Sequence, residues 1–168
     1  MPIHPILKYP HPVLKKVCNQ VENIDQYIID LVQDLVDTMH AGPGSVGVAA
    51  SQIGVTLRVC VVDVSKNRLG KENNHGLLCM INPEITSRSG VAIMREGCMS
   101  VPDYTGDVDR ATEITVSFSE LDGSQREINA SGFEAVALQH EMDHLDGVLF
   151  LDRIISIKTG LFRRKNST

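Results

Sequence analysis

The sequence predicts one domain, spanning residues 1–168, in which helices are combined with β-strands. Two stretches, 24–40 and 132–146, have the signals of helices, and residues 113–130 have the pattern of two strands joined by a turn. A chain of 168 residues buries roughly two thirds of its unfolded surface in a single core, so folding alone requires no metal. No repeat or low-complexity segment divides the chain.

The first predicted helix spans residues 24–40, where apolar residues recur at the spacing of one helical face. These residues are Ile24, Ile28, Leu31, Leu35 and Met39. Glycine and proline at positions 42–44 end the helix. Because the apolar run at 48–50 is too short for an element of its own, we predict a loop there that enters an extended segment.

Four further stretches have the composition of strands. β-branched residues fill 57–64, and a shorter apolar run at 77–81 ends before Asn82-Pro83. Residues 113–119 alternate between apolar and polar, and Asp122-Gly123 precedes a second polar strand at 125–130. This pattern predicts a half-exposed hairpin. The polar stretch 66–75 is predicted to be a loop.

The second predicted helix, at about residues 132–146, has signals at both ends. Ser131 and Glu134 have the spacing of a capping box, in which side chains satisfy the first backbone N–H groups. Gly147 stands where a left-handed residue commonly ends a helix. The strongest chemical motif of the chain lies on this helix.

Residues 140–144, His-Glu-Met-Asp-His, match the H-E-x-x-H pattern. At about 100° per residue, His140 and His144 differ by only about 40° around the helix axis, so both imidazoles can reach one ion. Glu141 projects beside the ion, where a carboxylate can take a proton from water. We therefore predict His140 and His144 as metal ligands and Glu141 as the general base.

A catalytic site of this kind needs a third protein ligand, and the sequence restricts its position. No glutamate follows Glu141 and no histidine follows His144. Phe150 stands where a metzincin would have its third histidine. The third ligand therefore comes from upstream, unless Asp146 or Asp152 serves.

Cys98 is the leading upstream candidate. It follows a glycine that permits close backbone approach, and a proline at position 102 stiffens the exit of this segment. Its thiolate would add negative charge and a soft donor that suits iron or zinc. Cys18, Cys60 and Cys79 are widely spaced and form no C-x-x-C pair, so we expect all the cysteines to stay reduced.

Composition excludes several classes of partner. The formal net charge of −5 gives no general attraction to phosphate backbones, so nucleic acid is not expected as the main partner. The apolar runs are interrupted by charge after a few residues, so no membrane segment is expected. Prolines and histidines near the N-terminus replace the apolar stretch of a secretory signal, and we expect a cytoplasmic protein.

Three segments together resemble the peptide deformylase family, whose motifs are G-φ-G-φ-A-A-x-Q, E-G-C-L-S and Q-H-E-x-D-H-L-x-G. Here they read SVGVAASQ at 45–52, EGCMS at 96–100 and QHEMDHLDG at 139–147. The first departs at Ser45, and the second has Met99 in place of leucine. The resemblance extends to the opening residues 6–10 and covers most of the chain.

The resemblance implies an α+β fold, in which antiparallel strands pack around a central metal-binding H-E-x-x-H helix, with a further helix near the N-terminus. It implies a metal-dependent hydrolase that removes the N-formyl group from the N-terminal methionine of newly synthesised proteins and releases formate. The implied cofactor is one divalent metal ion, natively Fe2+, with Zn2+ or Ni2+ as substitutes. The implied partners are N-formylmethionyl nascent peptides, met at the ribosome.

The resemblance also assigns roles outside the helix. The Gln52 side-chain amide and the backbone N–H of Met99 would stabilise the oxyanion that forms when water adds to the formyl carbon. Glu141 would then pass its proton to the leaving amine. Some deformylases have an arginine seven residues after the cysteine, where this chain has Thr105. Its contacts with the peptide backbone are therefore expected to differ.

The helix also suggests how methionine is selected. The predicted substrate-binding residues are Val46, Gly47 and Met94, near the other two motifs, and Phe133, Val136 and Ala137 on the helix. The last three precede His140 on the same helical face, where they wall a pocket or form plain core. Asp143 projects to the other side of His140 and either orients a loop residue such as Arg110 or faces solvent.

Two alternative functions remain open at this point. A metallopeptidase that cuts internal bonds would share the water-activating chemistry, but the missing downstream ligand argues against it. A catalytically silent domain would bind nascent chains with a structural ion or none. In that case Glu141 and Gln52 would have no reason to accompany the ligands.

Overall fold

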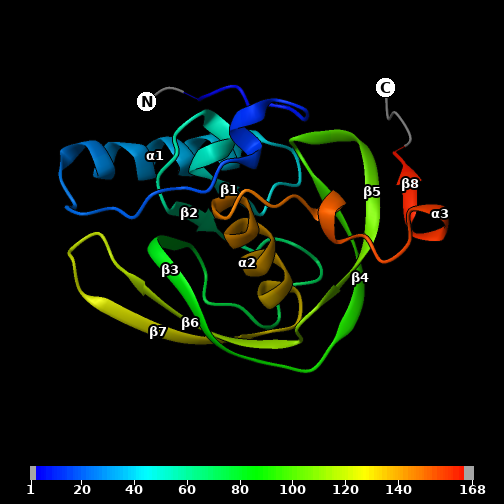
Figure 1. Cartoon of the computed structure of the whole chain (residues 1–168). Helices are drawn as coiled ribbons and strands as arrows, with labels where there is room; N and C mark the ends of the chain where they lie inside the picture. Colours follow the sequence, from blue (N-terminus) through cyan, green and yellow to red (C-terminus); the bar gives the residue numbers. More distant parts are fainter. Residues whose placement is uncertain (1–2, 165–168) are drawn as a thin grey trace.

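Residues 3–164 are described by a computed structural model of the chain (Figure 1). The first helix, α1 (Gln26–Ala41), begins where Asp25 accepts a hydrogen bond from the backbone N–H of Ile28 at 3.2 Å. Its apolar face is buried against strands β1 (Gly47–Ala49) and β2 (Val59–Val62). The predicted helix at 24–40 is therefore confirmed, with its start two residues later.

Five antiparallel strands form the larger sheet in the order β1-β2-β3-β6-β7. The remaining members are β3 (Leu78–Ser89), β6 (Glu113–Ser119) and β7 (Gln125–Ser131). Every residue of β1 and β2 is buried, because α1 packs on these strands together with α2 (Gly132–Leu145). The loop predicted at 48–50 is wrong, since residues 47–49 pair with β2.

Strand β3 corrects a second prediction. The sequence suggested a strand that ends before Asn82-Pro83, but β3 continues to Ser89. A register shift between Ile81 and Glu84 accommodates the proline, which cannot donate a ladder hydrogen bond. Asn82 adopts a φ of +51° there, and its side-chain amide bonds both backbone groups of Val21.

The hairpin of β6 and β7 is confirmed at both strands and at its turn. Gly123 has a φ of +87°, and Asp122 accepts a hydrogen bond from the backbone N–H of Ser124 at 2.9 Å. Ile114, Val116 and Phe118 are buried in a core that also contains apolar residues of α2. The alternation along the strand therefore places one face of the hairpin under the helix.

A second sheet of three antiparallel strands was not predicted. It has the order β4-β5-β8, with β4 (Ala92–Cys98), β5 (Val101–Arg110) and β8 (Leu161–Arg163). Most of β4 is exposed or half-buried, and β5 contains Pro102 and Gly106, so neither has the apolar pattern of a strand. Their pairing places Cys98 at the end of β4, next to the tight turn at 99–100.

Helix α2 spans the residues predicted for it, but its N-terminus is capped differently. Gly147 has a φ of +74°, and a side chain there would overlap the backbone of Lys15. The predicted capping box is wrong, because the Ser131 side chain makes no cap hydrogen bond. Glu134 instead accepts from the backbone N–H of His75 at 2.7 Å and lies 2.6 Å from its ring Nδ1. It ties the loop at 66–75 to the helix.

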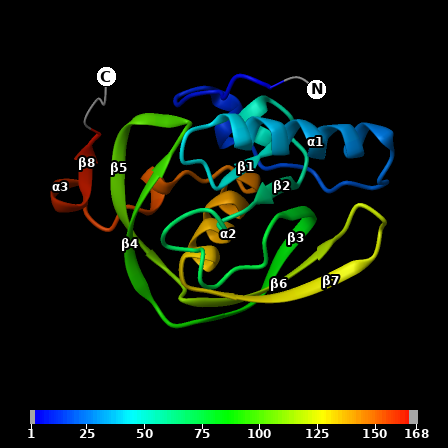
Figure 2. The ribbon, with the colours of Figure 1, turned by 180° about the vertical axis from the view of Figure 1, so that it is seen from behind.

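Helix α2 lies between the strands of the two sheets in both opposite views (Figures 1 and 2). Twelve of its fourteen residues are buried, polar side chains of the H-E-x-x-H motif included. Short helical turns connect the remaining segments, namely Pro12–Lys15, Ala50–Ile53, Phe150–Arg153 and the helix α3 (Ile157–Gly160). Within residues 3–164, no helix has the length and apolar character needed to cross a membrane.

Candidate metal centre

The structure brings together the three predicted metal ligands. His140 and His144 lie one turn apart on α2, and Cys98 ends β4. One potential ligand atom from each lies within 4.8 Å of the others, and Cys98 Sγ is 3.4 Å from His144 Nε2. The alternative ligands lie in ion pairs elsewhere, Asp146 with Arg58 and Asp152 with Lys15.

The environment of Cys98 favours its thiolate. Burial raises the pKa of the thiol, but the neighbouring rings of His144 and His140 bring the pKa well below its ordinary value. All four cysteines of the chain are free. For Cys60, by contrast, burial raises the pKa well above its usual value. Of these two buried cysteines, Cys98 is the one suited to bind a metal.

A buried ion-pair network orients His140. The His140 Nδ1 lies 2.9 Å from Glu96 Oε1, which leaves Nε2 for the metal. Arg110 donates to both Glu96 oxygens, at 2.6 and 2.8 Å. Although burial raises the pKa of the Glu96 carboxyl, hydrogen bonds from Arg110 and His140 lower it to about 2. Glu96 lies within the second motif but was not predicted as a site residue.

Asp143 belongs to the same network. Its carboxylate accepts from Arg110 Nη1 at 2.6 Å and from Arg153 Nε at 2.6 Å. The contact between Asp143 and Arg110 considered from sequence is therefore present, although Arg110 ends β5 and does not lie in a loop. The network thus connects α2 to β4 and β5 through ion pairs between carboxylates and guanidinium groups.

Glu141 lies beside the ligands in a buried environment. Its carboxylate packs directly on Gly47, where an added Cβ would lie 2.7 Å from Glu141 Oε2. Burial raises the pKa of the Glu141 carboxyl, against the opposing effect of His140 and His144. Among the described residues, Glu141 Oε1 and His144 Nδ1 are buried without a hydrogen-bond partner. Unpaired buried polar atoms and a thiolate–imidazole donor set both fit a divalent ion at this site.

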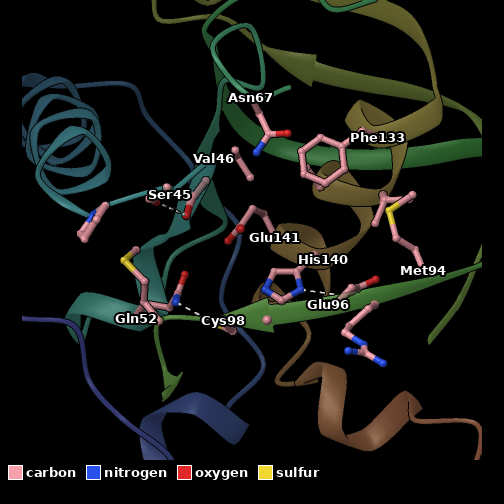
Figure 3. Close-up of a pocket in the computed structure, with 18 of the residues that line it drawn as sticks. Ser45, Val46, Gln52, Asn67, Met94, Glu96, Cys98, Phe133, His140 and Glu141 are labelled. Carbon is pink, nitrogen blue, oxygen red and sulfur yellow. Dashed lines mark hydrogen bonds and ion pairs between the residues drawn. The ribbon is translucent and has the colours of Figure 1, made fainter. Parts of the chain in front are cut away.

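Gln52 faces the same centre from the other side (Figure 3). Its Oε1 accepts from the backbone N–H of Ala49 at 3.0 Å, which turns its NH2 group toward the ligands. That group donates to Ser100 Oγ at 3.0 Å and lies 3.5 Å from Cys98 Sγ. Ser100 was not predicted, because a serine in a turn carries no signal of its own.

A cavity of about 290 Å³ opens beside the centre. All six predicted substrate-binding residues line it, namely Val46, Gly47, Met94, Phe133, Val136 and Ala137. Figure 3 shows Val46 and Phe133 on opposite sides of a space above Glu141 and His140. Gln52 and Met99 line the same cavity, whereas His144 is buried and does not line it.

Several lining residues were not predicted. Asn67 comes from the loop at 66–75, and Arg164 comes from the end of the described chain. Phe150 lies outside the cavity lining but stacks on the His140 ring, with 6.3 Å between the ring centroids. None of these residues lies in a motif, so only the tertiary structure could assign them to the site.

Known proteins are similar in sequence to this chain along almost all of its length. The family model for polypeptide deformylase matches residues 3–160. A peptide deformylase from Syntrophobacter fumaroxidans is 44% identical over 165 residues, which cover 98% of this chain and 94% of that relative. The chain belongs to the polypeptide deformylase family. The family activity, removal of the N-formyl group from nascent chains, is therefore its activity, and the enzyme predicted from the three motifs is confirmed over the two alternatives.

Solved structures of the family share the fold. The crystal structure of a peptide deformylase from Thermotoga maritima has a TM-score of 0.84 and 31% identity, and covers 93% of this chain and 100% of that one. A Met-Ala-Ser-bound peptide deformylase from Acinetobacter baumannii has a TM-score of 0.83 and 32% identity, with 91% and 99% covered. These neighbours confirm the mixed architecture of helices and antiparallel strands. Family membership and the three clustered ligands together indicate a single metal ion.

Proposed function

We propose that the chain works as one catalytic domain over residues 1–168, with α2 as its central metal-binding element. Cys98, His140 and His144 hold the ion. The observation that carries this assignment is the approach of three potential ligand atoms to within 4.8 Å of one another, in a buried site that also contains unpaired polar atoms. Side chains from β4 and α2 must meet to form it.

The soft sulfur and two imidazoles suit Fe2+ as the native ion, with Zn2+ or Ni2+ as substitutes. When bound, such an ion supplies Lewis-acid chemistry, because it lowers the pKa of water and polarises a carbonyl oxygen. Glu96 contributes indirectly. Its hydrogen bond to Nδ1 fixes the His140 ring and keeps Nε2 directed at the ion.

Glu141 is the proposed general base and acid. Its buried carboxylate has an oxygen with no partner among the described residues, so it can accept a proton from the attacking water. The water oxygen adds to the formyl carbon, and Glu141 then gives the proton to the peptide nitrogen. The bond between formyl carbon and nitrogen breaks, and formate and a free amino terminus are released.

Two donors of this chain are proposed to stabilise the oxyanion on the formyl oxygen. One is the Gln52 side-chain amide, whose orientation is fixed by Ala49 and directed at Cys98 and Ser100. The other is the backbone N–H of Met99, which follows Cys98 in the tight turn between β4 and β5. Preorganised donors of this kind stabilise the transition state because they need no reorientation during the reaction.

The cavity beside the centre is proposed to hold the methionine side chain. Val46, Phe133 and Val136 give it apolar walls, and Ala137 keeps space open one turn before His140. The relative from Acinetobacter baumannii was solved with Met-Ala-Ser, a peptide with this N-terminal residue. We propose formyl-methionyl peptides as substrates, met in the cytoplasm as they emerge from the ribosome.

The direct test uses formyl-Met-Ala-Ser and Met-Ala-Ser as paired substrates. Protein purified without oxygen should release formate from the first peptide and leave the second intact. Removal of the metal by a chelator should abolish the release, and restoration with Fe2+, Ni2+ or Zn2+ should recover it to different extents. Cleavage of the internal bond of Met-Ala-Ser, or no formate with any ion, would contradict the proposal. Co-sedimentation with translating ribosomes tests the proposed site of action.

A further inference from the structure

The end of the described chain returns to the mouth of the active-site cavity. Strand β8 pairs with β5 from Tyr104 to Gly106 and follows the short helix α3. Immediately after it, the backbone N–H of Arg164 donates to the carbonyl of Asp103 at 2.8 Å. Arg164 therefore has a fixed backbone, and its side chain lines the cavity together with the segment that carries Cys98.

The guanidinium of Arg164 rests on bare backbone at Gly97. A Cβ added at Gly97 would overlap the Arg164 Nη2 and lie 3.3 Å from Thr105 Cγ2. Gly97 directly precedes the proposed ligand Cys98. The positive charge of Arg164 therefore lies against the residue next to that ligand. Thr105 lies beside it on β5 and carries no charge.

The contacts of neighbouring side chains leave the Arg164 guanidinium available to bind a ligand. Phe162 of β8 packs under Arg95, whose guanidinium carbon is 3.6 Å from the ring centroid, and this contact holds the strand against β4. Arg95 also pairs with Asp107 at 3.7 Å. Within residues 3–164, no carboxylate pairs with Arg164. A guanidinium has five donors and no acceptor, so it requires oxygen acceptors from elsewhere.

We propose that Arg164 binds the peptide part of the substrate beyond methionine, by donating hydrogen bonds to its backbone carbonyl oxygens. The inference rests on the proposed function, which places the formyl group at Glu141 and the methionine side chain beside Phe133. Arg164 and Gly97 line the same cavity as Phe133 and Glu141, and an extended peptide advances about 3.3–3.6 Å per residue, so we infer that the substrate residues directly after methionine meet this guanidinium. Arg164 is thus a specificity-determining residue that favours peptides over formyl-methionine alone.

Two amide-capped substrates test this role, because capping removes the terminal carboxylate that could otherwise pair with arginine. Arg164→Ala should raise KM for formyl-Met-Ala-Ser-amide about tenfold and leave kcat within about twofold, as expected for lost hydrogen bonds of a charged donor in an open site. The values for formyl-Met-amide should not change. Arg163→Ala is the matched control, since it removes the same charge from the adjacent residue, which does not line the cavity.

A rescue variant separates charge from structure. Thr105→Arg in the Arg164→Ala background places a guanidinium over Gly97 from the neighbouring strand, and should recover most of the lost KM. No recovery in a double variant of unchanged melting temperature would overturn the proposal. So would equal losses on both substrates, a loss confined to uncapped peptides, or equal effects of the two arginine variants. If the unaltered enzyme releases no formate from either substrate, the proposed function fails instead.

Discussion

The two sides of the candidate metal centre are built in different ways. Helix α2 supplies His140, Glu141 and His144 from five consecutive positions, whereas β4 supplies Cys98, which lies 46 residues before its partner His144. The helical side needs only the regular turn of the backbone to align its groups. The strand side needs a hairpin and a buried ion-pair network to reach the same point, through Glu96 and Arg110.

The difference shows where the site depends on long-range structure. Local geometry holds the two histidines in register whenever α2 is folded. The distance from Cys98 to the helix, and the orientation of the His140 ring, depend on contacts between β4, β5 and α2. Loss of a ligand on either side should therefore release the metal. Loss of Glu141 on the helical side should affect chemistry alone, and changes to the Glu96 network on the strand side should weaken metal retention.

Removal of a ligand from either side should have the largest effect. We expect Cys98→Ala and His144→Ala each to lose the metal and all measurable turnover, because two remaining ligands compete poorly with water. Metal content of protein purified without oxygen, measured by mass spectrometry, checks this. Cys79→Ala is the matched control, since that free cysteine lies on β3 outside the ligand cluster. Stoichiometric metal in Cys98→Ala would refute the ligand set.

Glu141→Ala should separate chemistry from metal binding. The variant removes only the proton carrier, so we expect a loss of about 10²- to 10⁴-fold in kcat with normal metal content. Steady-state kinetics combined with metal analysis provide the measurement. Glu141→Gln keeps the size of the group that packs on Gly47 and should lose turnover equally. Near-normal rates in both variants would exclude Glu141 as the base.

Glu96→Gln tests the network on the strand side. It leaves Arg110 with a weaker partner and frees the His140 ring, so we expect metal affinity to fall about 10- to 100-fold. Competition with a chelator measures this affinity. Arg153→Ala removes the solvent-exposed end of the same network and should cost less than about 1 kcal/mol of stability. Equal affinities in the two variants would show that ring orientation does not limit metal binding.

Ala137→Phe should have the smallest and most selective effect. A larger side chain there fills space that the substrate methionine needs, while the ligands, Gln52 and Glu141 are unchanged. We expect kcat/KM to fall about tenfold or more for formyl-Met relative to formyl-Ala substrates, with the metal retained. Equal losses on both would indicate general damage to α2, and no loss would place residue 137 outside the methionine pocket.

The elements with a regular hydrophobic periodicity were predicted from the sequence. The stripe from Ile28 to Met39 and the alternation from Ile114 to Phe118 each correspond to an element of the structure. The sheet of β4, β5 and β8 escaped prediction, because exposed and half-buried residues dominate β4. The capping box failed for a different reason. Glu134 has the right spacing, but the loop residue His75 bonds it instead.

The sequence alone identified the candidate groups for the chemistry. An α-helix longer than one turn places residues i and i+4 on one face, so the spacing of His140, Glu141 and His144 predicts a metal site without knowledge of any tertiary contact. Only the tertiary structure decided how Cys98 meets them, how Glu96 and Arg110 orient the His140 ring, and that Arg164 reaches the cavity mouth. These contacts join residues distant along the chain, and no local period encodes which strands pair. The groups on the helix are thus predictable from local sequence. The contacts that orient them and shift their pKa values depend on the fold.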